Sequence, residues 1–132
     1  MKCAYALALS LMFLLSSLAA NAQQQTEYSA IYSKCVKEAG PINNAVVEEC
    51  SGTASERAKA EITSRYKSIY ARLLAEAPED AEKFEKSQKS WLQYRNLHCD
   101  LAGAYVGSPM YGYCPMQLNS ARALELRELD GQ

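Results

Sequence analysis

The pattern of apolar and polar residues divides the chain into two unequal parts. Residues 3–18 are almost wholly apolar, and Met1-Lys2 places one positive charge before them. Beyond residue 22, apolar residues return at intervals of three and four, which is the period of a helix that buries one face. Alternation typical of strands is almost absent. The sequence therefore predicts an apolar leader followed by an all-α domain.

The first half of this domain is expected to hold two helices and a short turn. One helix begins near Tyr28 and ends at Gly40-Pro41. A helical turn over 45–50 follows. Thr53-Ala-Ser-Glu56 then has the form of a capping box, in which the Thr and Glu side chains satisfy exposed backbone amides at a helix start. A long helix is therefore predicted to begin near Thr53 and to end before Pro78.

The second half is expected to hold two more helices. Pro78 suits a first helical turn, and the acidic residues behind it suit the positive end of the helix dipole. This helix is predicted to run to about Ala104, a loop to cover residues 106–113, and Asn119 to cap the last helix. The predicted inward faces are Tyr28, Ile31, Tyr32, Cys35 and Ala39; Ala58, Ile62, Tyr66, Ile69, Leu73 and Ala77; Phe84, Gln88, Trp91, Arg95, His98, Ala102 and Tyr105; and Leu118, Arg122, Leu126 and Leu129.

The leader has the features of a secretory signal peptide. Ala20-Asn21-Ala22 offers the small residues that signal peptidase requires, so cleavage is expected before Gln23. A membrane anchor is the alternative, because the apolar run approaches the roughly 18–20 residues that span a bilayer. No stop-transfer pattern follows the run, which favours cleavage. Residues 1–22 are thus predicted to be removed, leaving 23–132 as one periplasmic or secreted domain without stable membrane insertion.

Four cysteines follow the leader: Cys35, Cys50, Cys99 and Cys114. An even number in a small exported domain indicates two disulfides, although three pairings are open to four cysteines. Both 35–50 and 99–114 span fifteen residues and enclose a Gly/Pro turn signal, so these are the proposed pairs. Zinc sites use closely spaced ligands, which this chain lacks. The fold class predicted is a small antiparallel bundle of three to four helices stapled by two disulfides.

Charge excludes one class of partner. With Lys2 removed, 13 basic residues face 15 acidic ones, and no long run of one sign occurs. Proteins that bind nucleic acid concentrate Lys and Arg on one surface, so no nucleic-acid partner is expected. No metal site and no cofactor site is predicted.

The stretch QKSWLQYRNLHC, residues 88–99, contains the only Trp of the chain. Gln88, Trp91 and Arg95 fall on one helical face because steps of three and four residues return to the same side. A buried guanidinium needs acceptors or an aromatic face, so a polar network inside the core is expected here. An exposed Trp/Arg binding patch is the alternative. His98 lies beside Cys99, but adjacent side chains on a helix diverge and the thiol is expected to be oxidised, so no enzyme is predicted.

The motif Gln88-x2-Trp91-x2-Tyr94-Arg95-x3-Cys99, with Cys114 and Arg122-x3-Leu126 downstream, resembles the LprI-like lysozyme-inhibitor family. The likeness covers most of residues 30–129, and Cys35 and Cys50 correspond to the earlier cysteine pair of that family. Tyr66 and Lys67 depart from its usual Leu-Asn. The resemblance implies that the motif residues (Gln88, Trp91, Tyr94, Arg95, Arg122 and Leu126) are structural.

For some members the resemblance implies inhibition of lysozyme or of another cell-wall hydrolase. An inhibitor must cover a cleft that contains two carboxylates. The loop Val106–Tyr113 is the candidate partner-binding loop, with Ser108, Met110, Tyr111 and Tyr113 as contact residues, since Tyr is favoured in interfaces. The alternative is a non-catalytic envelope stress, assembly or immunity-type protein that binds a different partner.

Overall fold

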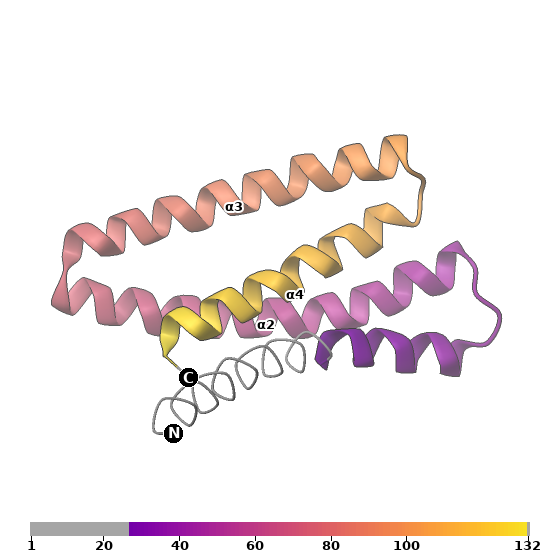
Figure 1. The fold of residues 1–132 in the computed structure, drawn as a ribbon, viewed down its shortest axis with the longest axis horizontal. Coiled ribbons are helices and arrows are strands. Elements are labelled where there is room, and N and C mark those ends of the chain that lie inside the picture. Colours follow the sequence, from indigo (N-terminus) through magenta and orange to yellow (C-terminus); the bar gives the residue numbers. More distant parts are fainter. Residues whose placement is uncertain (1–26, 132) are drawn as a thin grey trace, which may run out of the picture.

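The computed structural model describes residues 27–131, which form four helices and contain no strand. A first helix covers residues 27–39. It is followed by α2 (Asn44–Glu76), α3 (Pro78–Tyr105) and α4 (Met110–Asp130). Each helix runs opposite to the one before it (Figure 1). The all-α prediction is therefore confirmed, whereas the predicted signal peptide, residues 1–22, lies outside the described residues.

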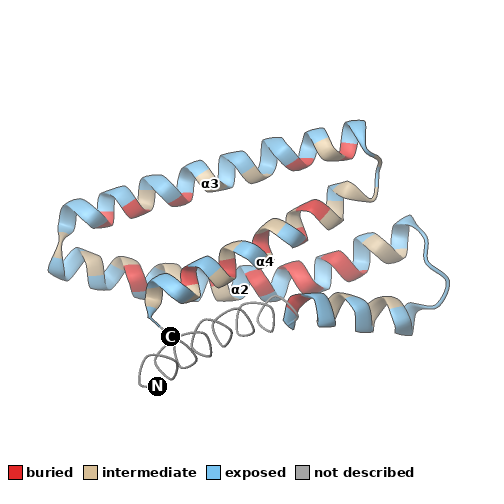
Figure 2. Ribbon diagram, in the orientation of Figure 1, coloured by how far each residue is buried: buried red, intermediate tan, exposed pale blue. Residues whose placement is uncertain are grey.

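The long helix α2 is the centre of the bundle. Its most extensive packing is against α4, while α3 touches both of them less. Much of α3 is exposed along its length (Figure 2). The core is correspondingly small, and its buried members are Tyr28, Ala58, Ile62, Ile69, Phe84, Ala123 and Leu126. None of the helices in the described part is both long and apolar enough to cross a membrane.

The start of α2 differs from the prediction. The helix begins at Asn44, and the Oδ1 atom of Asn43 caps it by accepting a hydrogen bond from the Val46 amide at 3.1 Å. Thr53 lies inside the helix, where its hydroxyl donates to the Glu49 carbonyl at 3.1 Å. The capping-box interpretation was wrong because nothing between residues 44 and 53 breaks the helix except Gly52, and burial of Cys50 and Ala54 offsets the cost of one glycine.

The start of α4 was also misplaced. Only residues 106–109 form a turn between α3 and α4, and the helix already begins at Met110. The turn depends on Gly107, whose φ of 148° is unfavourable for any residue with a side chain. Gly107, Ser108 and Pro109 gave residues 106–113 the composition of a loop, but Gly112 and Pro115 both lie inside α4. Asn119 is an interior, fully buried residue and not a cap.

Two disulfides brace one end of the bundle. Cys35–Cys50 joins the first helix to α2, and Cys99–Cys114 joins α3 to α4, with Cα atoms 5.4 and 5.5 Å apart. The pairing proposed from the sequence is confirmed. The turns 40–43 and 106–109 both lie at this end (Figure 1), and the Asn44 side-chain amide donates to the Ser108 hydroxyl across them at 2.8 Å. We call these two turns the braced end.

Charged and polar side chains from three of the helices form one ion network. The Arg127 guanidinium donates to both oxygens of Glu61, at 2.7 and 2.6 Å, and the Tyr28 hydroxyl donates to the same carboxylate. Arg65 lies 3.5 Å from Glu61 and 3.1 Å from Asp130. The network therefore connects the first helix, α2 and α4.

Gly103 allows α3 and α4 to approach closely. A methyl group at this position would lie 2.3 Å from ring carbons of Tyr111, whereas one at Gly52 would meet nothing within 4 Å. We expect Gly103→Ala to lower the free energy of unfolding by about 1–3 kcal/mol through overpacking. Gly52→Ala should raise it by about 0.5–1 kcal/mol because alanine favours the helix. Urea unfolding of the two variants would measure the contrast, and equal effects would contradict it.

Candidate functional site

The outer face of α3 carries an exposed apolar stripe. Its members are spaced by three, four and four residues, so they share one side of the helix, and all are exposed: Tyr94, Leu97, Leu101 and Tyr105. Tyr105 is the most exposed of them, at 85%. Tyr94 stacks on the ring of His98, with centroids 5.3 Å apart. Contiguous apolar residues that remain in water often mark a site of protein contact.

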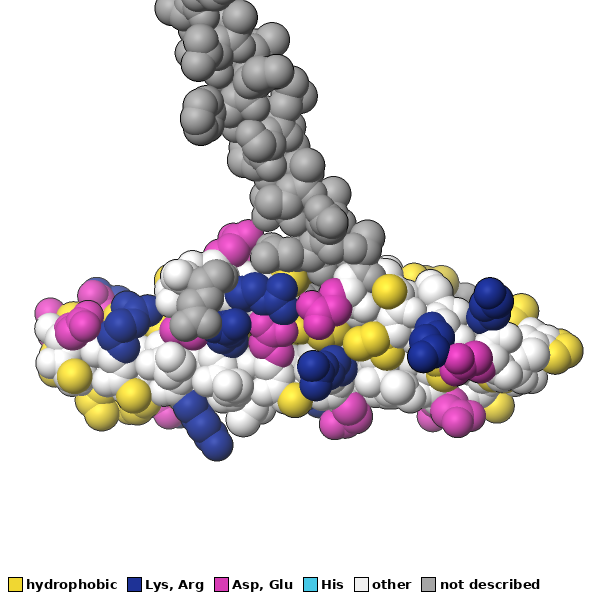
Figure 3. All heavy atoms as spheres, turned by 90° about the horizontal axis from the view of Figure 1, so that it is seen from below, with side chains coloured by type: hydrophobic (Ala, Val, Ile, Leu, Met, Phe, Trp, Pro, Cys, Tyr) yellow, Lys and Arg dark blue, Asp and Glu magenta, His cyan; other side chains and the backbone are white. Residues whose placement is uncertain are grey.

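The stripe leads directly into the braced end. Val106 follows Tyr105 and is 76% exposed, and Ile42 in the other turn is 67% exposed. Residues 106–113 carry no charged side chain. On the face shown in Figure 3, by contrast, basic and acidic side chains are interspersed. The stripe and the braced end together therefore form an apolar, uncharged surface on a covalently braced support.

The four predicted contact residues do not lie together in a free loop, because three of them belong to α4. Ser108 lies in the turn, Met110 is half-buried at the start of α4, and the Tyr111 ring covers Gly103 while staying partly exposed. Tyr113 packs edge-on against Tyr32, with centroids 5.4 Å apart. Two of the four thus support the packing of the bundle, and their role in partner binding stays a prediction.

Four of the six motif residues lie together between α3 and α4: Gln88, Trp91, Arg95 and Arg122. The Arg122 Nε atom donates to the Gln88 side-chain oxygen at 3.0 Å, and both Arg95 and Arg122 lie over the Trp91 ring, 5.3 and 5.6 Å from its centroid. Leu126 is fully buried in the core, whereas Tyr94 belongs to the exposed stripe. The arrangement is a guanidinium pair stacked on one indole ring.

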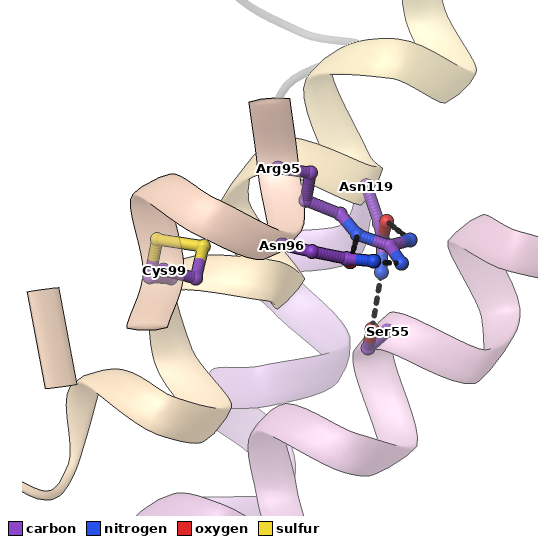
Figure 4. The surroundings of a disulfide bond; sticks show 6 residues. Ser55, Arg95, Asn96, Cys99 and Asn119 are labelled. Carbon is purple, nitrogen blue, oxygen red and sulfur yellow. Dashed lines mark hydrogen bonds between the residues drawn. A yellow bond between two sulfur atoms is a disulfide. The ribbon is translucent and has the colours of Figure 1, made fainter. Parts of the chain in front are cut away.

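A buried hydrogen-bond chain extends from this cluster to α2 (Figure 4). Arg95 Nη1 donates to the Asn119 side-chain oxygen at 2.9 Å, and Asn119 Nδ2 donates to the Ser55 hydroxyl at 2.7 Å. Arg95 also donates to Asn96 through Nε and Nη2. Burial lowers the pKa of the Arg95 guanidinium. Asn119 and Ser55 were not identified from the sequence as partners of Arg95. The signal for Asn119 was that a polar residue occupies an inward position of α4.

The predicted inward face of α3 needs correction at its C-terminal part. His98 and Tyr105 point to solvent, Trp91 is only half-buried, and Cys99 and Gly103 are the buried positions instead. Leu129, near the end of α4, is exposed as well. The buried stripe drifts around a long straight helix because 3.6 residues per turn does not match a repeat of 3.5.

The described residues offer neither a free nucleophilic thiol nor a set of metal ligands. Cys99 is bonded to Cys114 and therefore is not the free thiol that a Cys/His nucleophile requires. Within residues 27–131, no group of three or more His, Cys, Asp or Glu side chains is placed to hold a metal ion.

These features define a class of protein: a small disulfide-stapled helical bundle with an exposed apolar surface at its braced end. The family model for "Lysozyme inhibitor LprI" matches residues 35–126, and the chain belongs to this family. The match includes all four cysteines and the Gln88-to-Leu126 motif, so the resemblance seen in the sequence is confirmed. No curated protein sequence and no solved structure matches the chain.

Proposed function

We propose that this protein is an exported inhibitor of a lysozyme-type peptidoglycan hydrolase that covers the substrate cleft with its apolar stripe and braced end. Membership of the lysozyme-inhibitor family is the observation that carries the proposal. The protein acts by binding and carries out no reaction. Its place of action is the periplasm or the outside of the cell, where the target hydrolase meets the cell wall.

The geometry of the braced end suits this role. Two disulfides and the Asn44–Ser108 hydrogen bond hold the turns, so little conformational entropy is lost when they dock. The absence of charge over residues 106–113 avoids repulsion by the two carboxylates of a glycoside hydrolase cleft. Tyr105 and Val106 are the most exposed large apolar residues of this surface. They are therefore the side chains best placed to enter a cleft.

A lysis assay with a panel of lysozymes tests the proposal. We expect the purified protein to slow lysis by at least one of them at micromolar excess, and failure with every enzyme would remove the proposal. A protein recovered from an envelope extract as the one specific partner, and unrelated to lysozyme, would favour the alternative envelope role instead.

The variant Tyr105→Ala/Val106→Ser tests the choice of surface. Both side chains are exposed, so the fold should be unaffected, and loss of two interface anchors should weaken inhibition by at least about tenfold. Leu74→Ala is the matched control, because Leu74 is exposed near the α2–α3 turn at the opposite end of the bundle. Equal inhibition by both variants would show that the braced end is not the inhibitory surface. Tyr111 and Tyr113 are less informative positions because their rings pack against Gly103 and Tyr32.

A further inference from the structure

A groove lies between α2 and α3, away from the apolar stripe. Its volume is about 480 Å³, within the range of roughly 300–1,000 Å³ that small-molecule sites have. Its walls are formed largely by the side chains of Ile62, Tyr66, Trp91 and Leu92. Such walls would cover the hydrocarbon part of a ligand.

Three cationic side chains also line the groove. Within residues 27–131, two of them are paired with carboxylates, and the third is not. Lys59 pairs with Glu56 at 2.8 Å, and Lys89 pairs with Glu85 at 3.0 Å, each on its own helix. Arg95 has no carboxylate partner among the described residues. Its hydrogen bonds go to the neutral amides of Asn96 and Asn119. One positive charge that faces the groove is therefore left without a counter-charge.

Arg95 is also held in a fixed geometry. The hydrogen bond to buried Asn119, which Ser55 supports from α2, and the contact with the Trp91 ring both restrain the guanidinium. A guanidinium has five N–H donors, and the observed bonds employ three of them, one on each nitrogen. Two donors are left, which is the number that a bidentate carboxylate accepts.

We propose that this groove binds a small amphipathic carboxylate, with its hydrocarbon chain against Trp91, Leu92 and Ile62 and its carboxylate on Arg95. A single negative charge matches the single uncompensated cation. An apolar chain matches the walls, and the half-buried position of Arg95 strengthens a charge-assisted hydrogen bond relative to one in water. The inference is independent of the proposed inhibition, since the groove and the apolar stripe occupy different faces of α3.

The only Trp of the chain lines the groove, so its fluorescence reports occupancy directly. Octanoate is expected to change the Trp91 emission saturably, with a dissociation constant below about 1 mM. Octanamide, which has the same chain without charge, should bind at least about tenfold more weakly, and acetate should give no response. The proposal would be overturned if the emission change does not saturate at octanoate concentrations about 10-fold above that dissociation constant. Equal binding of octanoate and octanamide would also overturn it.

Three variants locate the site. Arg95→Gln should weaken octanoate binding by at least about tenfold, but Arg95 also contacts Asn119 and the change can disturb the fold. Leu92→Glu avoids this difficulty, because Leu92 is partly exposed and the new carboxylate would occupy the groove and repel the ligand. Leu97→Glu is its control on the outer face of the same helix. Leu92→Glu should lose octanoate binding and keep lysozyme inhibition, while Leu97→Glu should do the reverse. If Leu92→Glu and Leu97→Glu bind octanoate equally, the groove is not the site, whatever the inhibition assay shows.

Discussion

Replacing Cys99 and Cys114 together with alanine is expected to lower the free energy of unfolding by about 3 kcal/mol. The bridge closes fifteen residues, and releasing a loop of this size returns entropy of that order to the unfolded chain. Both cysteines are buried, so loss of their sulfur atoms also removes packing between α3 and α4. For a domain of this size, with a total stability of about 5–15 kcal/mol, the loss is large. Urea unfolding of the variant and the unmodified protein measures it.

The other bridge provides a matched control. Cys35–Cys50 also spans fifteen residues, so the same double change there should cost a similar amount by the loop-entropy argument. The two variants should differ in function, however. Only Cys99–Cys114 holds the α3–α4 end that carries Tyr105 and Val106, and its loss should weaken inhibition more at equal fraction folded. If the Cys35–Cys50 variant weakens inhibition as much, the braced end does not act through α3.

Helix positions and disulfides could be predicted from the sequence because each depends on local signals. Apolar spacing identified the inward side of α2 at Ala58, Ile62 and Ile69, all of which are buried. Pro78 marks the first residue of α3 as predicted. Equal cysteine intervals around a Gly/Pro signal gave both bridges. Each of these signals lies within a sequence separation of 15 residues, so none of them depends on how distant helices pack.

The starts of α2 and α4 and the exposed outer face of α3 could not be predicted, because tertiary contacts decide them. Thr53 and Asn119 both have capping chemistry, yet burial of their neighbours continues the helix through each position. Asn119 is accommodated in the interior because Ser55 and Arg95, which are distant in sequence, satisfy its amide. Leu97, Leu101 and Tyr105 have the composition of a core stripe, but none of the helices within residues 27–131 covers them. Sequence spacing shows which residues share a face and does not show whether a partner helix exists.

Sequence spacing also did not show which residues contact one another in the candidate sites. The motif predicted that Arg95 needs acceptors, and the structure supplies neutral ones. Because these acceptors are neutral, the positive charge of Arg95 in the groove is not compensated. An Asp or Glu at the position of Asn119 would have compensated it. A resemblance to the family points to the residues of the network, whereas the exposed stripe follows only from how α3 sits on α2 and α4.

Glu61→Gln is expected to destabilise the fold at neutral pH by about 2–3 kcal/mol and to remove much of the acid sensitivity of the protein. Hydrogen bonds from Arg127 lower the pKa of the Glu61 carboxyl from its ordinary value of 4.5 to about 2, against the opposing effect of burial, and Tyr28 and Arg65 act in the same direction as Arg127. The variant keeps the shape of the side chain and loses the charge on which Arg127, Arg65 and Tyr28 converge.

The pH dependence follows from the sign of this shift. A carboxyl whose pKa is lower in the folded state binds protons more readily in the unfolded chain, so its contribution is fully present above about pH 4.5 to 5 and is lost as the pH falls toward 2. The stability difference between wild type and Glu61→Gln should therefore shrink steadily over that window. Glu56→Gln is the control, because Glu56 forms an exposed pair with Lys59 and its loss should cost no more than about 0.5 kcal/mol at any pH. Urea unfolding at pH 7, 4 and 2.5 distinguishes the two, and a constant difference between wild type and Glu61→Gln would show that the network does not hold the carboxylate in its charged form.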